Sequence, residues 1–364
     1  MENARPPSCF HADATVTVAS MNTETIVGAG KDGLKKGEVR GTAEAYVAHF
    51  DRDDAQSVAD RYATITSQYY DLVTDFYEFG WGKAFHFATR REGEPFAEAL
   101  ARHEAYLSDH LGLRRGMKVV DFGCGVGGPM RHIARISGAD VTGVNISAYQ
   151  VEKARQYNRK AGLATRCHVL NADFLKIPVP DATFDAAYAI EATCHAPDKP
   201  SVYGEAARVL KPGGGFALYE WCMTPKFDPT NAEHRRLKLL IERGNGIAHL
   251  ASFDDVRAGL QQVGFDVLVE RDLADGTYPG VPWHADLDVE STKSSGPFSL
   301  RALPRTPLGR SVTNAATGLL ERVGLAPKGT RLVSSFLNDG ADALVRAGKL
   351  GIFTPMYFVH AKKR

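Results

Sequence analysis

The sequence lacks several features that define common functional classes. Its 364 residues carry 44 lysines and arginines against 43 aspartates and glutamates, so the net charge of +1 provides no basic field for nucleic acid. No apolar run approaches the ~20 residues that a membrane-spanning helix needs, and the first twenty residues lack the basic and apolar regions of a secretory signal. Five irregularly spaced cysteines form no zinc-ligand pair, which indicates free thiols in a reducing compartment.

Composition and periodicity divide the chain into five parts. Small and polar residues dominate 1–43, which we predict to be a disordered extension. Apolar residues recur at helical spacing over 44–112, ending with a strongly amphipathic helix. Strand-like and helix-like patterns alternate over 113–273. Residues 274–350 begin rich in proline, serine and glycine and then become helical, and 351–364 return to a strand pattern.

The alternation over 113–273 predicts an α/β fold with a doubly wound, mostly parallel sheet. We predict the last strand of the chain to be an antiparallel partner of the strand near 265–273, and the excursion before it to cap the active face. Residues 211–215, KPGGG, are interpreted as a turn. The strands are predicted at 117–123, 139–146, 166–173, 185–192, 216–221, 264–273 and 350–363, and the helices of the core at 130–137, 148–161, 201–210, 233–243 and 253–263.

A glycine loop follows the first predicted strand. Asp121, Gly123 and Gly125 form an acid-x-Gly-x-Gly pattern that also fits G-x-G-x-x-G, and such glycines allow a tight turn and close backbone approach to a ligand. A dinucleotide site favours an acid at the end of the second strand, to bind the ribose, and Asn145 stands there instead. Asparagine can also bind a ribose hydroxyl, so the loop alone leaves the cofactor open.

The wider pattern resembles that of S-adenosylmethionine-dependent methyltransferases, which add a polar residue after the second strand and an acid after the third. Their cofactor has no phosphates and needs no basic clamp. The pair Tyr70–Asp71 resembles a cofactor-contacting Tyr-Asp pair of cyclopropane-fatty-acid synthases. These resemblances imply the following cofactor-binding residues: Tyr70, Asp121, Gly123, Cys124, Gly125, Asn145, Gln150, Asp173 and Phe174.

Residues 75–87, DFYEFGWGKAFHF, are unusually aromatic: six of the thirteen are phenylalanine, tyrosine or tryptophan. This stretch, together with VVDFGCGVGGPMR, AIEATCHAP, RVLKPGGGFALYEW and IFTPM, resembles the sterol 24-C-methyltransferase family from about residue 44 to the end. The resemblance implies a class I methyltransferase fold that transfers a methyl group to carbon 24 of a Δ24-sterol. One departure is VPWHADL, where His284 replaces the family's usual tyrosine and leaves the sterol contacts open.

Methylation of an isolated alkene creates a carbocation, which aromatic faces can stabilise without capturing it, by ~0.5–2 kcal/mol each. Tyr77, Phe79 and Trp81 are the candidate cage, although such rings are also common in cores. By the resemblance, Asp75 and Glu78 are functionally important carboxylates near it. Glu191 and His195 end the fourth strand, and either is a candidate for accepting the final proton. The predicted catalytic set is Asp75, Tyr77, Glu78, Trp81, Glu191 and His195.

Three alternatives remain open: methylation of another alkene such as squalene, cyclopropanation of an acyl chain, and a sterol carrier without activity. We expect no metal, because His86, His103 and Glu104 match no standard ligand spacing. The expected partners are a sterol and a membrane surface, which the protein would contact peripherally near Phe298 and Leu300. We expect no nucleic acid as a partner, and a homo-oligomer is possible. The expected location is the cytoplasm, at the endoplasmic reticulum membrane in a eukaryote.

Overall fold

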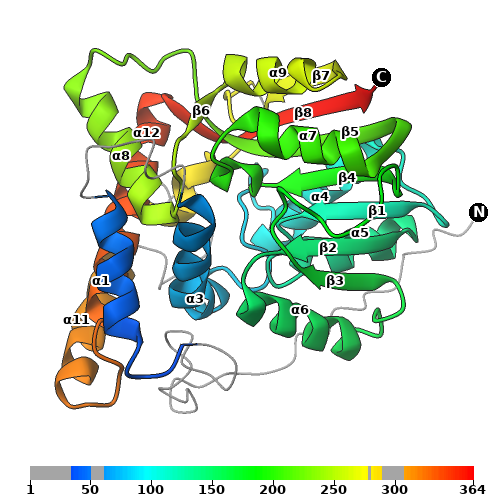
Figure 1. The fold of residues 1–364 in the computed structure, drawn as a ribbon. Coiled ribbons are helices and arrows are strands. Elements are labelled where there is room, and N and C mark those ends of the chain that lie inside the picture. Colours follow the sequence, from blue (N-terminus) through cyan, green and yellow to red (C-terminus); the bar gives the residue numbers. More distant parts are fainter. Residues whose placement is uncertain (1–33, 51–60, 278–279, 289–306) are drawn as a thin grey trace, which may run out of the picture.

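The computed structural model describes residues 34–50, 61–277, 280–288 and 307–364. Its centre is an eight-stranded sheet in the order β3-β2-β1-β4-β5-β8-β7, with β6 paired to β5 (Figure 1). The pairs among β1 to β6 are parallel, whereas β8 runs antiparallel to both β5 and β7. The strands are β1 Lys118–Phe122, β2 Asp140–Asn145, β3 Cys167–Asn171, β4 Phe184–Ile190, β5 Leu210–Met223, β6 Ala251–Ser252, β7 Phe265–Asp272 and β8 Phe353–Lys363.

Alternate residues of the central strands feed two apolar layers, because successive side chains of a strand point to opposite faces. In β4, Tyr188 joins the layer packed against α4 (Phe96–His110), α5 (Gly128–Ser137) and α6 (Ala148–Lys160). Its neighbours Ala187 and Ala189 join the layer under α7 (Lys199–Val209) and α9 (Phe253–Gln262). Burial on both faces explains the nearly continuous apolar runs that identified these strands.

A helical layer stands beside the carboxyl ends of the parallel strands (Figure 1). Its core joins sequence-distant helices, with Tyr46, Tyr69 and Phe336 among the buried residues. The remaining helices of the layer pack on these or on the sheet. Its members are α1 Val39–Phe50, α3 Tyr62–Gly80, α8 Ala232–Asn245, α11 Pro307–Arg322 and α12 Thr330–Leu350, with short 3₁₀ turns η3 Thr193–His195 and η4 Trp283–Leu287 nearby.

The predicted parallel sheet and its antiparallel last strand are confirmed. Two predicted boundaries are wrong. Helix α1 begins at Val39, inside the predicted disordered extension, because Val39 and Ala43 are buried against α3 and α12. Strand β5 begins at Leu210, so the segment KPGGG lies within its bounds, and the register with β4 shifts there between the pairings of Leu210 and Gly215.

Helices α8 and α12 cross at two glycines, and this contact sets how closely the helical layer packs. A Cβ on Gly340 would lie 2.9 Å from the Cα of Gly244. We predict that Gly340→Ala lowers the free energy of unfolding by about 1–3 kcal/mol, because the helices must separate. Urea denaturation measures the change. Gly41→Ala, at an exposed position of helix α1 with open space around it, is the matched control and should be neutral or slightly stabilising.

Candidate active site

A cleft, here called the strand-end cleft, lies at the carboxyl ends of the parallel strands beside the glycine loop. Gly123 has φ +79°, and a Cβ there would lie 2.4 Å from the Cβ of Ala192, so only glycine fits under the loop after β4. Eight of the nine residues predicted to bind the cofactor line this cleft: Tyr70, Gly123, Cys124, Gly125, Asn145, Gln150, Asp173 and Phe174.

The ninth predicted residue, Asp121, lies beneath the glycine loop and does not line the cleft. It is buried and accepts a hydrogen bond of 3.0 Å from the hydroxyl of Tyr188. Burial raises the pKa of Asp121 to about 7, and the Tyr188 hydrogen bond opposes that rise. The Asp121 side chain therefore links β1 to β4 just before the loop begins.

One wall of the cleft is a chain of side-chain hydrogen bonds between α3 and α6. Asn145 donates to Gln150 Oε1 at 2.7 Å, and Gln150 Nε2 donates to Thr74 Oγ1 at 2.9 Å. Ser147, the N-cap of α6, donates to Asp71 at 2.8 Å. These bonds hold α3 over the cleft and fix which atoms of Asn145 and Gln150 remain available to a ligand.

Tyr62 closes the far side of the cleft and was missed by the sequence analysis. Its hydroxyl donates to Asp173, and its ring stacks with Phe174 at 6.4 Å between centroids. It begins α3, more than a hundred residues before its two partners. No local motif signals such a contact.

The tautomer of His195 follows from its two hydrogen bonds. Its Nδ1 lies 2.9 Å from the carbonyl oxygen of Gly246, which can only accept, so Nδ1 carries the proton. Its Nε2 lies 2.8 Å from the hydroxyl of Tyr70 and accepts from it. Burial lowers the pKa of His195 to about 4, so the ring is neutral at physiological pH.

Glu191 directly follows β4 and adopts the left-handed region, with φ +52°. One carboxylate oxygen accepts the backbone N–H of Phe87 and the other accepts the indole N–H of Trp221, each at 2.7 Å. Burial raises the pKa of Glu191 to about 8, opposed by nearby His86 and by the two donors. Each carboxylate oxygen therefore accepts a hydrogen bond that fixes its position. When Glu191 is ionised, its negative charge is held in one place.

A second hollow, here called the aromatic cavity, adjoins the strand-end cleft, and Phe85 lines both. Its rings pack on one another: Tyr77 lies 5.4 Å from Phe85, and Phe87 lies 5.6 Å from Trp81 and 6.0 Å from Trp221. The cavity thus receives two of the predicted cage residues, Tyr77 and Trp81. The side chain of the third, Phe79, lies outside the described residues.

Trp221, on β5, is a cavity residue that the sequence analysis missed. Its strand was predicted, but nothing in the pattern showed which face it would line. Polar side chains also line the cavity, and most of them come from the cap. They include Arg310, Thr313, Ser334 and Asn338.

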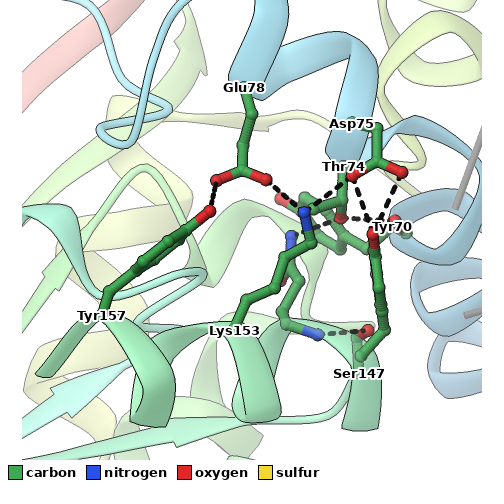
Figure 2. Close-up of polar contacts among 9 residues, drawn as sticks. Tyr70, Thr74, Asp75, Glu78, Ser147, Lys153 and Tyr157 are labelled. Atoms are coloured by element: carbon green, nitrogen blue, oxygen red, sulfur yellow. Dashed lines mark hydrogen bonds and ion pairs between the residues drawn. The ribbon is translucent and has the colours of Figure 1, made fainter. Parts of the chain in front are cut away.

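Asp75 and Glu78 do not line either hollow, although both were predicted near the cage. Figure 2 shows them turned toward α6, where Lys153 lies between them. Asp75 accepts from Lys153 at 2.8 Å and from Tyr149 at 2.8 Å, and Glu78 accepts from Lys153 and Tyr157. Burial opposes the charge of Lys153, but its hydrogen bonds to both acids outweigh this and raise its pKa.

The histidines considered as metal ligands take part in hydrogen bonds and stacking. Glu104 accepts from His86 at 3.0 Å and from His132 at 2.5 Å, while His103 stacks on Tyr219. His284 packs against Gly348 and lies outside the aromatic cavity. Phe298 and Leu300 lie outside the described residues.

Comparison with known proteins gives two family matches. Residues 120–218 match a methyltransferase domain, and residues 300–363 match the sterol methyltransferase C-terminal family. Cycloartenol-C-24-methyltransferase 1 of Oryza sativa subsp. japonica is 45% identical over 91% of this chain and 94% of its own length. Sterol 24-C-methyltransferase ERG6 of Saccharomyces cerevisiae is 45% identical over 86% of this chain and 82% of its own.

Solved structures agree on the fold. A mycolic acid cyclopropane synthase has a TM-score of 0.64 at 18% identity, covering 83% of this chain and 98% of that one. Geranyl diphosphate C-methyltransferase of Streptomyces coelicolor A3(2) has a TM-score of 0.58 at 17% identity, with the same coverage. Fold and sequence define a class I methyltransferase that uses S-adenosylmethionine. Within this class, the chain belongs to the sterol 24-C-methyltransferase family.

Because of Glu191, we expect the affinity of the enzyme for S-adenosylmethionine, relative to its demethylated product S-adenosylhomocysteine, to depend on pH. Below its pKa of about 8 the carboxyl is neutral, and above it the carboxylate attracts the sulfonium of S-adenosylmethionine but not the neutral sulfide of S-adenosylhomocysteine. We predict that the affinity ratio of donor to product rises by up to about tenfold as pH increases through this value. Calorimetric titration at several pH values measures both affinities.

The control for this prediction is a second buried acid. Glu242 also has a pKa raised by burial but lines neither hollow, so Glu242→Gln should keep the pH dependence. Glu191→Gln should abolish it. A ratio that stays flat with pH in the unsubstituted protein contradicts the prediction.

Proposed function

We propose that this enzyme transfers the methyl group of S-adenosylmethionine to carbon 24 of a Δ24-sterol. The proposal rests on the adjacency of the two sites. Phe85 lines both the strand-end cleft and the aromatic cavity. A donor in the cleft would face the end of an apolar side chain in the cavity. The relatives named above support a sterol as the acceptor.

The strand-end cleft fits the cofactor. Gly123 and Gly125 would admit the methionine part to the backbone, Asn145 and Gln150 would bind the ribose, and Phe174 would contact the adenine. When bound, S-adenosylmethionine supplies an electrophilic methyl group on a sulfonium. The residues of the chain then have two tasks: to stabilise a cation on carbon 25 of the sterol, and to accept a proton.

Stabilisation of the cation falls to the rings of the aromatic cavity. The faces of Tyr77, Trp81 and Phe85 can attract positive charge by ~0.5–2 kcal/mol each, and none forms a bond with carbon readily. Apolar surroundings also exclude water, which would capture the cation. Above its pKa of about 8, the charge of Glu191 would add longer-range attraction while its two N–H donors keep its oxygens from bonding to carbon.

Tyr70 and His195 form the route for the final proton. As Tyr70 accepts a proton on its oxygen, it can pass its own hydroxyl proton to Nε2 of His195, whose lone pair already faces it. The carbonyl of Gly246 stabilises the resulting imidazolium through Nδ1. We assign His195 as the base that acts through Tyr70, and Glu191 as an electrostatic and positioning group.

The polar side chains that α11 and α12 contribute to the cavity lining would receive the 3-hydroxyl of a sterol. Arg310 pairs with Asp342 through Nη2, while Nε and Nη1 are buried without a hydrogen-bond partner among the described residues. A sterol hydroxyl could accept from such a donor, whereas squalene has no oxygen to offer. The unpartnered donors of Arg310 therefore favour a sterol over a hydrocarbon triterpene.

Product analysis tests the function directly. The full chain is incubated with labelled S-adenosylmethionine and, separately, a Δ24-sterol, squalene or an unsaturated acyl lipid. Mass spectrometry should find the label in a sterol methylated at carbon 24. Label found only in squalene, or a cyclopropane ring in the acyl lipid, would overturn the proposal.

A sterol is held in membranes, so we also propose that the enzyme acts at a membrane surface by peripheral contact. No helix in the described part of the chain is long and apolar enough to span a bilayer. The oligomeric state stays a matter for solution measurement.

The ring of Tyr77 should matter more than its hydroxyl. We predict that Tyr77→Leu lowers the methylation rate at least about tenfold while cofactor affinity barely changes, because the ring contacts the cation and not the donor. Tyr77→Phe keeps the ring and loses the hydrogen bonds of the hydroxyl to Tyr69 and Asn245. It should stay within a few-fold of the unsubstituted rate in single-turnover assays. Equal rates in all three proteins would remove Tyr77 from the cage.

Arg310 should recognise the hydroxyl end of the substrate. We predict that Arg310→Leu raises KM for the sterol about tenfold, since a hydrogen bond from a charged donor is lost, and leaves KM for a 3-deoxy analogue unchanged. Asp342→Asn is the control, because it removes the ion-pair partner of Arg310 but keeps the guanidinium. Steady-state kinetics with both sterols separate the cases. An equal loss with both sterols would indicate only structural damage.

A further inference from the structure

Helix α11 has apolar side chains on its solvent face and polar side chains on its inner face. The side chains on its solvent face recur at helical spacing, and the large ones are aliphatic: Leu308, Val312 and Leu319 are 66%, 61% and 62% exposed, and Val323, just beyond the helix, is 59% exposed. We call these four residues the α11 stripe. Ala315 and Ala316, also exposed, continue it. A surface helix of a globular protein normally turns such a stripe toward the core.

The inward face of the same helix is polar. Arg310 and Thr313 line the aromatic cavity, and Thr317 is buried. Arg310 and Asn314 also have buried polar atoms without a hydrogen-bond partner among the described residues. One helix therefore separates a substrate cavity on one side from an exposed apolar face on the other.

Positive charge lies at the C-terminal end of the α11 stripe. Arg322 and Lys328 are exposed, and the ammonium group of exposed Lys36 donates to the carbonyl of Gly324 at 2.7 Å. The one acid in residues 307–328 is Glu321, and its carboxylate accepts the backbone N–H groups of Gly329 and Arg331 at the start of α12. The flank thus presents cations, while its acid is engaged in capping a helix.

We propose that the α11 stripe is the surface by which the enzyme docks on a lipid bilayer that contains anionic phospholipids. Aliphatic side chains on a helix that lies in the interface, flanked by lysine and arginine, are the features that bind such a surface. Figure 1 shows α11 at the outer end of the helical layer, away from the sheet. If the enzyme docks through this stripe, the aromatic cavity lies next to the membrane. The docking surface itself does not depend on the proposed function; only the identity of the lipid that enters the cavity does.

Vesicle flotation tests the docking surface without turnover. The full chain, without cofactor, is mixed with vesicles of phosphatidylcholine, or of phosphatidylcholine and phosphatidylserine. The variant Leu308→Ser/Val312→Ser/Leu319→Ser/Val323→Ser should lose at least about tenfold in binding. The unsubstituted chain should bind more strongly to the anionic vesicles. Unfolding midpoints of the two proteins should agree, because the four side chains are exposed.

The matched control removes exposed aliphatic residues from other faces of the molecule. Ile136, Leu239 and Leu268 are 48%, 51% and 54% exposed on α5, α8 and β7, and Ile136→Ser/Leu239→Ser/Leu268→Ser should bind vesicles normally. The stripe variant should still methylate a sterol dispersed in detergent at the unsubstituted rate, but methylate the same sterol in vesicles slowly.

Two outcomes would overturn the docking surface. One is a stripe variant that floats as well as the unsubstituted chain. The other is a chain that ignores vesicles and forms a dimer which the four substitutions split, as measured by light scattering; the stripe would then bind a second copy. Normal flotation with no methylation of any sterol would instead support the docking surface and refute the proposed function.

Discussion

The carboxylate of Glu191 joins three parts of the chain that are distant in sequence. It extends from the end of β4, and its two oxygens accept N–H groups from Phe87, the last residue of the aromatic stretch, and from Trp221 on β5. Each of these donors, buried without a partner, would cost about 1–3 kcal/mol. Glu191 itself adopts a left-handed backbone, which costs about 1–3 kcal/mol at a residue other than glycine. The aromatic cavity therefore depends on this one group for its position beside the strand ends.

Helix geometry explains how α3 can carry both rings and acids. Residues three or four apart share a face of a helix, so Tyr77 and Trp81, which follows the last turn, reach the cavity together, whereas Asp75 and Glu78 face α6. An unshielded carboxylate in the cavity could capture a carbocation as an ester. In this structure both acids are bound to Lys153, so the same short motif provides rings for one surface and an anchor for another.

The parts of the fold that were predictable are those governed by local pattern. Strands buried on both faces give continuous apolar runs, and a glycine loop after such a strand marks the cleft, which is why eight of the nine residues predicted to bind the cofactor line one cleft. What escaped prediction depends on partners far away in the chain. Tyr62 reaches Asp173, Trp221 reaches Glu191, and α1 is ordered at Val39 only by contact with α3 and α12. Spacing within a segment contains no information about such partners.

Helix α11 shows a different limit of pattern reading. Its apolar stripe would normally be assigned to the core, yet the stripe faces outward, because the inner side borders a cavity whose lining there is polar. This arrangement of apolar and polar faces fits a ligand that is mostly apolar and has one hydroxyl group. The rings of α3 and β5 suit its hydrocarbon end, and the polar groups of α11 and α12 suit its oxygen. A helix that meets the polar end of a lipid on its inner side is left with its aliphatic residues on the outer side, where only an apolar environment would cover them.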